Sequence, residues 1–124
     1  MGYESKLYIV EKQNKFSFEE KRYARVIAMF DLCKHNTITD FLKHCPETDC
    51  YFFADDGRTK VLKDKYNVSL KETTLPIIIN KLEQIIDEGE TYRRVFPLLA
   101  LLKTINVQQN NNMWNDVVVL HYGY

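Results

Sequence analysis

The sequence VVVLHY, residues 117–122, is the most strand-like stretch of the chain, and only two residues follow it. Its β-branched and apolar residues favour a strand, and such a strand left unpaired would promote aggregation. The end of a chain is frayed unless something holds it, so we predict that this strand lies inside a sheet. Alternation gives each face three side chains: Val117, Val119 and His121 against Val118, Leu120 and Tyr122.

Two further strands are expected near the N-terminus. Residues 6–11 alternate weakly between apolar and polar side chains. Tyr, Val, Ile and Phe dominate residues 23–32 and favour a strand there, although Ala24, Ala28 and Met29 also suit a helix. We predict that these two strands form a hairpin-like pair with a longer connection.

A hairpin is predicted in the middle of the chain. Two apolar runs, residues 50–54 and 59–62, flank Asp56 and Gly57. Asp-Gly between such runs is a strong turn signal, because both residues tolerate positive φ. Residues 67–73 are predicted to form a loop.

Three helices complete the pattern. A short helix covers residues 38–45, and a longer one begins after Thr73 or Thr74 and stops at Gly89, with apolar residues along one face. Thr91 is the expected start of the last helix, whose apolar residues lie nearly all round it. We therefore expect that helix to be the most buried.

The predicted order is strand, strand, helix, strand, strand, helix, helix, strand. It indicates a single α+β domain over residues 1–124. We expect an antiparallel or mixed sheet of about five strands, with the helices packed on one face.

Composition and net charge argue against two classes of function, duplex DNA binding and DNA mimicry. Apolar residues make up 45% of the 124 residues and charged residues 27%, which is typical of a globular protein. The 17 basic and 17 acidic residues give a formal net charge of zero. A dedicated duplex DNA binder carries a basic excess and a DNA mimic needs an acidic one. A partner that binds through electrostatic attraction must therefore contact a local charged patch.

The expected setting is cytoplasmic. Three cysteines are too few for a disulfide framework, and an odd number cannot all be paired within the chain. No apolar run approaches the roughly 20 residues that cross a bilayer. Lys6, Glu11 and Lys12 interrupt the apolar stretch near the N-terminus, so we expect no signal peptide and a reducing compartment.

A zinc site is one open alternative. Five residues of suitable type lie close together in the sequence: Cys33, His35, His44, Cys45 and Cys50. Zinc takes four such ligands, but structural sites usually offer closer pairs. The other interpretation is that Cys33 and Cys50 are small buried hydrophobic residues.

No catalytic motif is present. The four glycines stand alone, so there is no phosphate-binding loop, and the nucleophile and metalloprotease motifs are absent. Asp55 and Asp56 suit either a tight turn or a divalent cation, and their flanking strands favour the turn. We predict a protein that is not an enzyme and needs no cofactor.

Three stretches resemble small accessory proteins of bacteriophages and prophages of low-GC bacteria. They are residues 2–12 (GYESKLYIVEK), 50–57 (CYFFADDG) and 117–124 (VVVLHYGY). The resemblance implies a class whose members often act by binding a host or phage protein. Many inhibitors of bacterial immunity, anti-CRISPR proteins included, are small and lack enzymatic motifs.

We therefore expect a binding module that occludes a partner protein. Tyr, Trp and Arg dominate interface energetics, and the candidate contact residues are Tyr51, Arg58, Lys60, Tyr66, Arg93, Arg94 and Trp114. Tyr51 and Trp114 suit a position in the core equally well. The alternative is nucleic-acid contact through the basic stretch 60–71, whose lysines alternate with Tyr66. Pairing of an edge strand would allow a homodimer.

Overall fold

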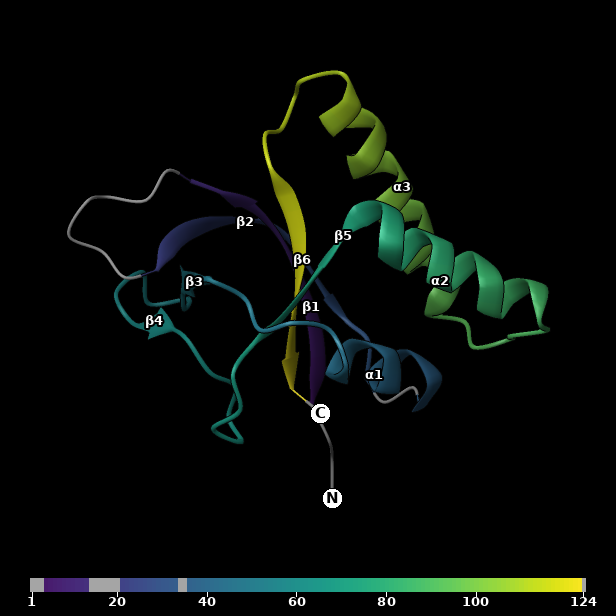
Figure 1. Cartoon of the computed structure of the whole chain (residues 1–124), viewed down its shortest axis with the longest axis horizontal. Helices are drawn as coiled ribbons and strands as arrows, with labels where there is room; N and C mark the ends of the chain where they lie inside the picture. The colour runs from purple at the N-terminus through teal and green to yellow at the C-terminus, as the bar shows by residue number, and fades with distance from the viewer. Residues whose placement is uncertain (1–3, 14–20, 34–35, 124) are drawn as a thin grey trace.

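The computed structural model describes residues 4–13, 21–33 and 36–123. Its elements form an α+β fold, as predicted (Figure 1). In chain order they are β1 Ser5–Lys12, β2 Arg22–Asp31, α1 Asn36–Lys43, β3 Cys50–Phe53, β4 Lys60–Val61, β5 Lys71–Thr74, α2 Leu75–Asp87, α3 Val95–Asn110 and β6 Val117–Gly123.

In this described part of the chain, the six strands form a sheet in the order β4-β3-β2-β1-β6-β5. Neighbouring strands are antiparallel except β2 and β3, which are parallel, so the sheet is mixed. The last strand, β6, lies between β1 and β5, which confirms its predicted interior place. Its other neighbour, β5, overlaps the predicted loop 67–73 at residues 71–73, so the loop prediction is wrong for those three residues. Lys71–Thr74 is polar, and it forms a strand because it pairs with the neighbouring strand β6.

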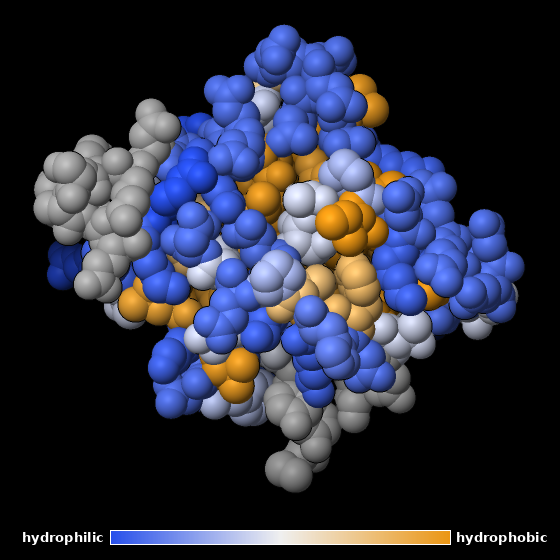
Figure 2. Space-filling model, in the orientation of Figure 1, coloured by the Kyte–Doolittle hydropathy of each residue, from blue (hydrophilic) through white to orange (hydrophobic). Residues whose placement is uncertain are grey.

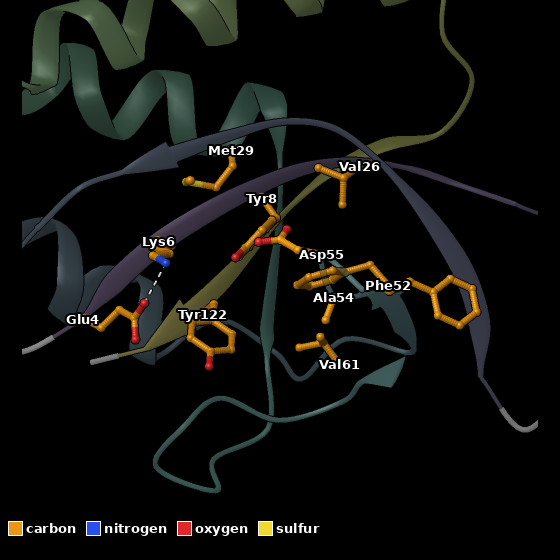
Figure 3. Close-up of a pocket in the computed structure, with 11 residues that line it drawn as sticks. Glu4, Lys6, Tyr8, Val26, Met29, Phe52, Ala54, Asp55, Val61 and Tyr122 are labelled. Carbon is orange, nitrogen blue, oxygen red and sulfur yellow. Dashed lines mark ion pairs between the residues drawn. The ribbon is translucent and has the colours of Figure 1, made fainter. Parts of the chain in front are cut away.

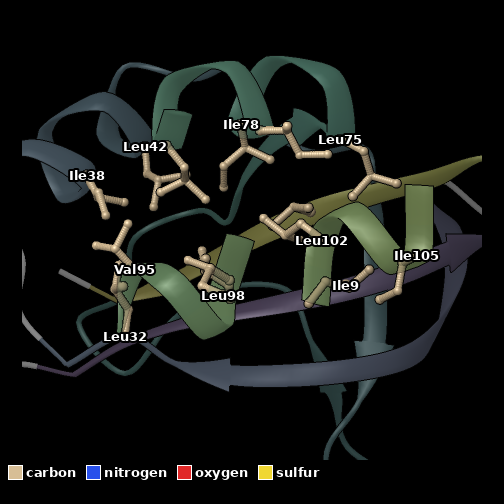
Figure 4. Close-up of a cluster of buried hydrophobic side chains, with 14 of the residues drawn as sticks. Ile9, Leu32, Ile38, Leu42, Leu75, Ile78, Val95, Leu98, Leu102 and Ile105 are labelled. Carbon is tan, nitrogen blue, oxygen red and sulfur yellow. The ribbon is translucent and has the colours of Figure 1, made fainter. Parts of the chain in front are cut away.

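The helices cover one face of the sheet, as expected. Leu7 pairs with His121 and Ile9 with Val119 across β1 and β6, so these odd-numbered residues share that face. All three helices contribute to the same cluster of buried side chains (Figure 4). Each fully buried leucine or isoleucine in it contributes about 1.5–3 kcal/mol.

The last helix begins later than predicted. Thr91 was the expected start, but α3 begins at Val95. The side-chain oxygen Oε1 of Glu90 accepts the backbone N–H groups of Thr91 and Tyr92 at 3.0 and 2.8 Å. These bonds hold the segment before α3 in a non-helical turn.

The same helix is also less buried than predicted. One side of α3 is buried through Val95, Leu98, Leu102 and Ile105. On the other side Phe96 is 47% exposed and Val107 is 58% exposed. Four of the 16 residues of α3 are buried, against five of the 13 residues of α2, so the prediction that the last helix is the most buried one is wrong.

The predicted hairpin joins β3 and β4. Its connection is longer than a two-residue turn: Phe53 pairs with Lys60, and Gly57 has a φ of 69°. The Thr59 hydroxyl and the backbone N–H groups of Thr59 and Arg58 donate to the Asp56 carboxylate at 2.6–2.9 Å. These donors lower the pKa of Asp56 to about 2. Asp56 thus serves the turn, as its position in the sequence indicates.

Gly123 at the end of β6 gives a first testable prediction. Its φ is +112°, and a Cβ placed there would lie 1.8 Å from the backbone oxygen of Glu4. We expect Gly123→Ala to lower the free energy of unfolding by about 2 kcal/mol or more, measured by urea denaturation. Gly57→Ala is the matched control: its φ is also positive, but nothing lies within 4 Å of the added Cβ. Equal losses for both variants would contradict a steric role of Gly123.

Candidate functional site

The face of the sheet opposite the helices carries a second apolar cluster. Val10, Val118 and Leu120 point to this side and pack with Phe52 of β3. The predicted division of β6 between two faces is thereby confirmed for its valines and Leu120. Because β3 pairs with β2 only at its beginning, the hairpin bends over the helix-free face. A hollow remains between the hairpin and the sheet.

This hollow is a pocket of about 360 Å³. Its apolar wall combines Tyr8 of β1, Val26 and Met29 of β2, Phe52 of β3 and Tyr122 of β6 (Figure 3). The volume lies at the lower end of the range for ligand pockets. It is large enough for one bulky side chain or a small molecule. We call this feature the sheet pocket.

Aromatic rings organise the sheet pocket. The centroids of Tyr8 and Phe52 lie 4.4 Å apart with the planes tilted by 32°. Tyr122 meets Tyr8 edge to face, with centroids 6.1 Å apart and an interplanar angle of 76°. Such contacts favour fixed ring positions. Burial raises the pKa of Tyr8, against the opposing effect of the Lys6 ammonium, so its hydroxyl stays protonated at neutral pH.

Three charged residues lie at the pocket: Glu4, Lys6 and Asp55. The Lys6 ammonium is 2.7 Å from Glu4, and Lys65 approaches the same carboxylate at 3.2 Å. The hydrogen bond from Lys6 is the main reason that the pKa of Glu4 lies below its usual value. Within the described residues, no ion pair engages Asp55. Asp55 is therefore the carboxylate of the lining that remains available to a ligand.

Exposed apolar side chains border the sheet pocket. Val26 is 38% exposed, Met29 48% and Phe53 36%. All three belong to the pocket lining. Single exposed apolar residues are ordinary, but a group of them beside a hollow marks an interaction site. On the face drawn in Figure 2, hydrophobic residues lie in several separate patches among hydrophilic ones.

The structure gathers three of the predicted contact residues on the β3–β4 hairpin. Tyr51 is only 6% exposed and packs against the rings of Tyr23 and Phe53. The ammonium of Lys60 lies 4.6 Å from the centre of the Tyr51 ring. Arg58 is exposed in the turn. Tyr51 is thus a packed residue, while Lys60 and Arg58 remain accessible.

Tyr66 lies in the basic stretch 60–71, where several charges already have partners. The backbone N–H of Glu4 donates to the Tyr66 hydroxyl at 3.2 Å. Lys65 forms its ion pair with Glu4, and Lys71 lies 4.0 Å from Glu47. These acidic neighbours reduce the positive potential that a nucleic-acid phosphate would meet.

The remaining predicted residues lie elsewhere. Arg93 and Arg94 are exposed just before α3, and Arg94 Nη1 donates to the backbone oxygen of Asp31 at 2.7 Å. Trp114 packs against the main core, and its Nε1 donates to Gln108 Oε1 at 2.9 Å. None of the three lines the sheet pocket.

One group of potential metal ligands forms within the described residues: Asp49, Cys50 and Glu72. Lys12 pairs with both carboxylates, with Nζ 3.1 Å from Asp49 Oδ1 and 3.0 Å from Glu72 Oε1. Burial raises the pKa of the Cys50 thiol to about 11, and a protonated thiol is a poor metal ligand. This group fits an internal ion cluster better than a cation site.

The cysteine and histidine residues considered for zinc do not gather. Among residues 4–13, 21–33 and 36–123, Cys33, His44 and Cys45 join no group of three metal-ligating side chains. Cys45 donates instead to the backbone oxygen of Phe41. His35 lies outside the described residues.

Ser5 and His121 form a buried pair near the end of β6. The Ser5 hydroxyl and His121 Nε2 are 3.0 Å apart, a distance typical of a nucleophile and its base. Ser5 has no exposed surface and His121 is 3% exposed. A substrate therefore cannot reach the hydroxyl in this conformation, and the contact holds β1 to β6.

Sequence reasoning did not identify the residues of the sheet pocket. Alternation places Tyr8 with Val10, and Tyr122 with Leu120, on one side of each strand. Only the register between β1 and β6, which pairs Tyr8 with Leu120, brings these rings to the same place. The bend that adds Phe52 has no local signal.

Comparison with known proteins adds no identity: no family model, curated protein or solved structure matches this chain. In the part of the chain that the structure describes, no helix combines the length and apolarity needed to cross a membrane. Function must therefore be inferred from the surface and the sheet pocket.

Proposed function

We propose that this protein is a non-enzymatic binding module that grips another protein through the sheet pocket and its apolar border. The observation that carries the proposal is the placement of exposed Val26, Met29 and Phe53 beside a hollow lined by Tyr8 and Tyr122. Interface anchors are commonly apolar or aromatic side chains that fill such pockets.

The open edge of β2 offers a second means of binding a partner next to the sheet pocket. Within the described residues β2 pairs with β3 only at Arg22 and Tyr23, so the remainder of that edge is open beside Val26 and Met29. An open edge can accept a partner strand. A second copy of the chain is one such partner.

The resemblance to phage accessory proteins suggests the setting. We propose that the bound protein is a host or phage protein, such as a component of bacterial immunity, and that binding blocks it sterically. The charge pattern favours this over nucleic-acid binding, since the lysines Lys65 and Lys71 already face acidic side chains.

Selection from a random peptide library displayed on phage tests the proposal. We expect peptides that bind the protein and lose at least roughly tenfold in affinity against Met29→Glu, because a charge at the border opposes apolar contact. Met113→Glu is the matched control, since Met113 is 63% exposed and does not line the sheet pocket.

Two results would contradict the proposal. One is a selection that enriches no peptide, and the other is a set of peptides that bind Met29→Glu as well as the unaltered protein. Retardation of single-stranded DNA or RNA that falls steeply with salt and ignores Met29→Glu would support the nucleic-acid alternative instead.

A further inference from the structure

The sheet pocket combines aromatic rings with a carboxylate. Tyr8 and Tyr122 stand at a steep angle to each other and form a corner of the pocket. The face of an aromatic ring carries partial negative charge, which attracts a cation placed over it. The pocket therefore offers more than an apolar surface.

The charges of the lining favour a cation as well. Two carboxylates, Glu4 and Asp55, face one ammonium, Lys6. The Glu4 carboxylate is already shared by Lys6 and Lys65. Lys65 is not part of the lining, so the lining itself carries one carboxylate more than ammonium groups. Asp55 is the lining carboxylate that no ion pair engages within the described residues.

The Asp55 carboxylate is also close enough to influence the rings. Burial is the main cause of the raised pKa of Tyr8. The Lys6 ammonium opposes it, and Tyr122 and then Asp55 add to it. In Figure 3 the Asp55 carboxylate is drawn next to Tyr8 among the residues that line the pocket. The rings of Tyr8 and Tyr122 and the Asp55 carboxylate therefore border the same part of the sheet pocket.

We propose that the sheet pocket accepts an arginine side chain of the partner protein, with the guanidinium beside Tyr8 and Tyr122 and its charge balanced by Asp55. This inference rests on the proposed function and names the chemistry of the anchoring residue. A guanidinium suits the site because it is planar, stacks on rings and pairs with a carboxylate.

The pocket is large enough for such a side chain. Its volume of about 360 Å³ exceeds what a single guanidinium with its three-carbon stem requires. Val26 and Met29 at the border would contact the apolar stem, as long cationic side chains commonly allow. The apolar border and the charged end of the ligand thus have separate roles.

An NMR titration tests this inference with Nα-acetylarginine amide as the probe. Nα-acetylcitrulline amide is the matched control, because it has nearly the same shape and no charge. We expect the arginine probe at millimolar concentration to shift the resonances of Tyr8, Phe52 and Tyr122. The citrulline probe is expected to bind roughly tenfold more weakly.

Asp55→Asn separates the charge from the shape of the pocket. Asp55 is exposed, and its replacement should leave the thermal transition unchanged. We expect about tenfold weaker binding of the arginine probe and unchanged binding of the citrulline probe. Asp87→Asn on the exposed side of α2 is the control and should alter neither. The inference is overturned if citrulline binds as well as arginine, if Asp55→Asn has no effect, or if no shift occurs at the sheet pocket.

The two proposals fail in different ways. Selected peptides that depend on Met29 but lack a basic residue leave the binding function intact and overturn the arginine anchor. Binding of the arginine probe without any selected peptide supports the chemistry of the pocket and contradicts the function as a protein-binding module.

Discussion

A chain that lacks residues 117–124 is expected to show no cooperative thermal transition. The deletion removes β6, which lies between β1 and β5. Its loss leaves β5 without its strand partner, and α2 follows β5 directly at Leu75. The start of α2 would therefore no longer be held, because β5, which leads into it, would not be paired in the sheet.

The buried surface of β6 gives the size of this effect. Its four buried apolar residues are Val117, Val118, Val119 and Leu120, and they serve both clusters of the protein. At about 1.5–3 kcal/mol for each buried side chain, they contribute roughly 6–12 kcal/mol. A domain of this kind has a free energy of unfolding of about 5–15 kcal/mol. The loss is comparable to the whole stability.

A point substitution tests the same prediction without shortening the chain. Val119 has no exposed surface, and we expect Val119→Asp to lower the free energy of unfolding by more than about 3 kcal/mol, since a buried charge has no partner there. Val107→Asp on the exposed side of α3 should change it by less than about 0.5 kcal/mol. Urea denaturation followed by circular dichroism measures both. A soluble truncated chain with a sharp melting transition would contradict the architecture.

The strands and helices that the sequence predicts are those whose signals are local. The apolar run at residues 117–122, the turn at Asp56 and the face of α2 each depend on neighbouring residues, and the structure contains all three. The polar strand β5 could not be predicted in this way. Lys71 and Thr73 are extended because His121 and Val119 pair with them, and that partner lies about fifty residues away in the sequence.

The candidate site depends on similar long-range relations. Tyr8 and Phe52 touch only because β3 leaves β2 after Tyr51 and bends over the sheet. The sequence left open whether Tyr51 is exposed or lies in the core, and the structure buries it. Residue type alone does not show which of two faces of a strand remains open.

His121 is expected to make the protein sensitive to mild acid. Its ring is 3% exposed, and burial lowers its pKa from 6.5 to about 4. The Lys43 ammonium acts in the same direction and the Asp64 carboxylate opposes it. Lys71 lines a second hollow together with Lys43 and His121, and it adds a further positive neighbour. The folded protein therefore holds this histidine neutral.

The sign of the effect follows from proton binding in the two states. Between pH 6.5 and 4 the unfolded chain protonates His121 while the folded protein does not, so stability falls as the pH falls. The shift corresponds to about 3 kcal/mol across that range. The carboxyl groups whose pKa is lowered, such as Glu11 and Asp56, act mainly below about pH 4.5. The two contributions therefore overlap at about pH 4–4.5, and the histidine dominates above that range.

His121→Asn isolates the contribution of the histidine. The variant should be less stable at pH 7, because it loses the packed ring and its contact with Ser5, but its stability should stay nearly constant between pH 6.5 and 5. His44→Asn, at an exposed histidine, should keep the slope of the unaltered protein. Urea denaturation at a series of pH values measures all three. An unchanged slope in His121→Asn would show that the acid sensitivity arises elsewhere, because no other described histidine is buried.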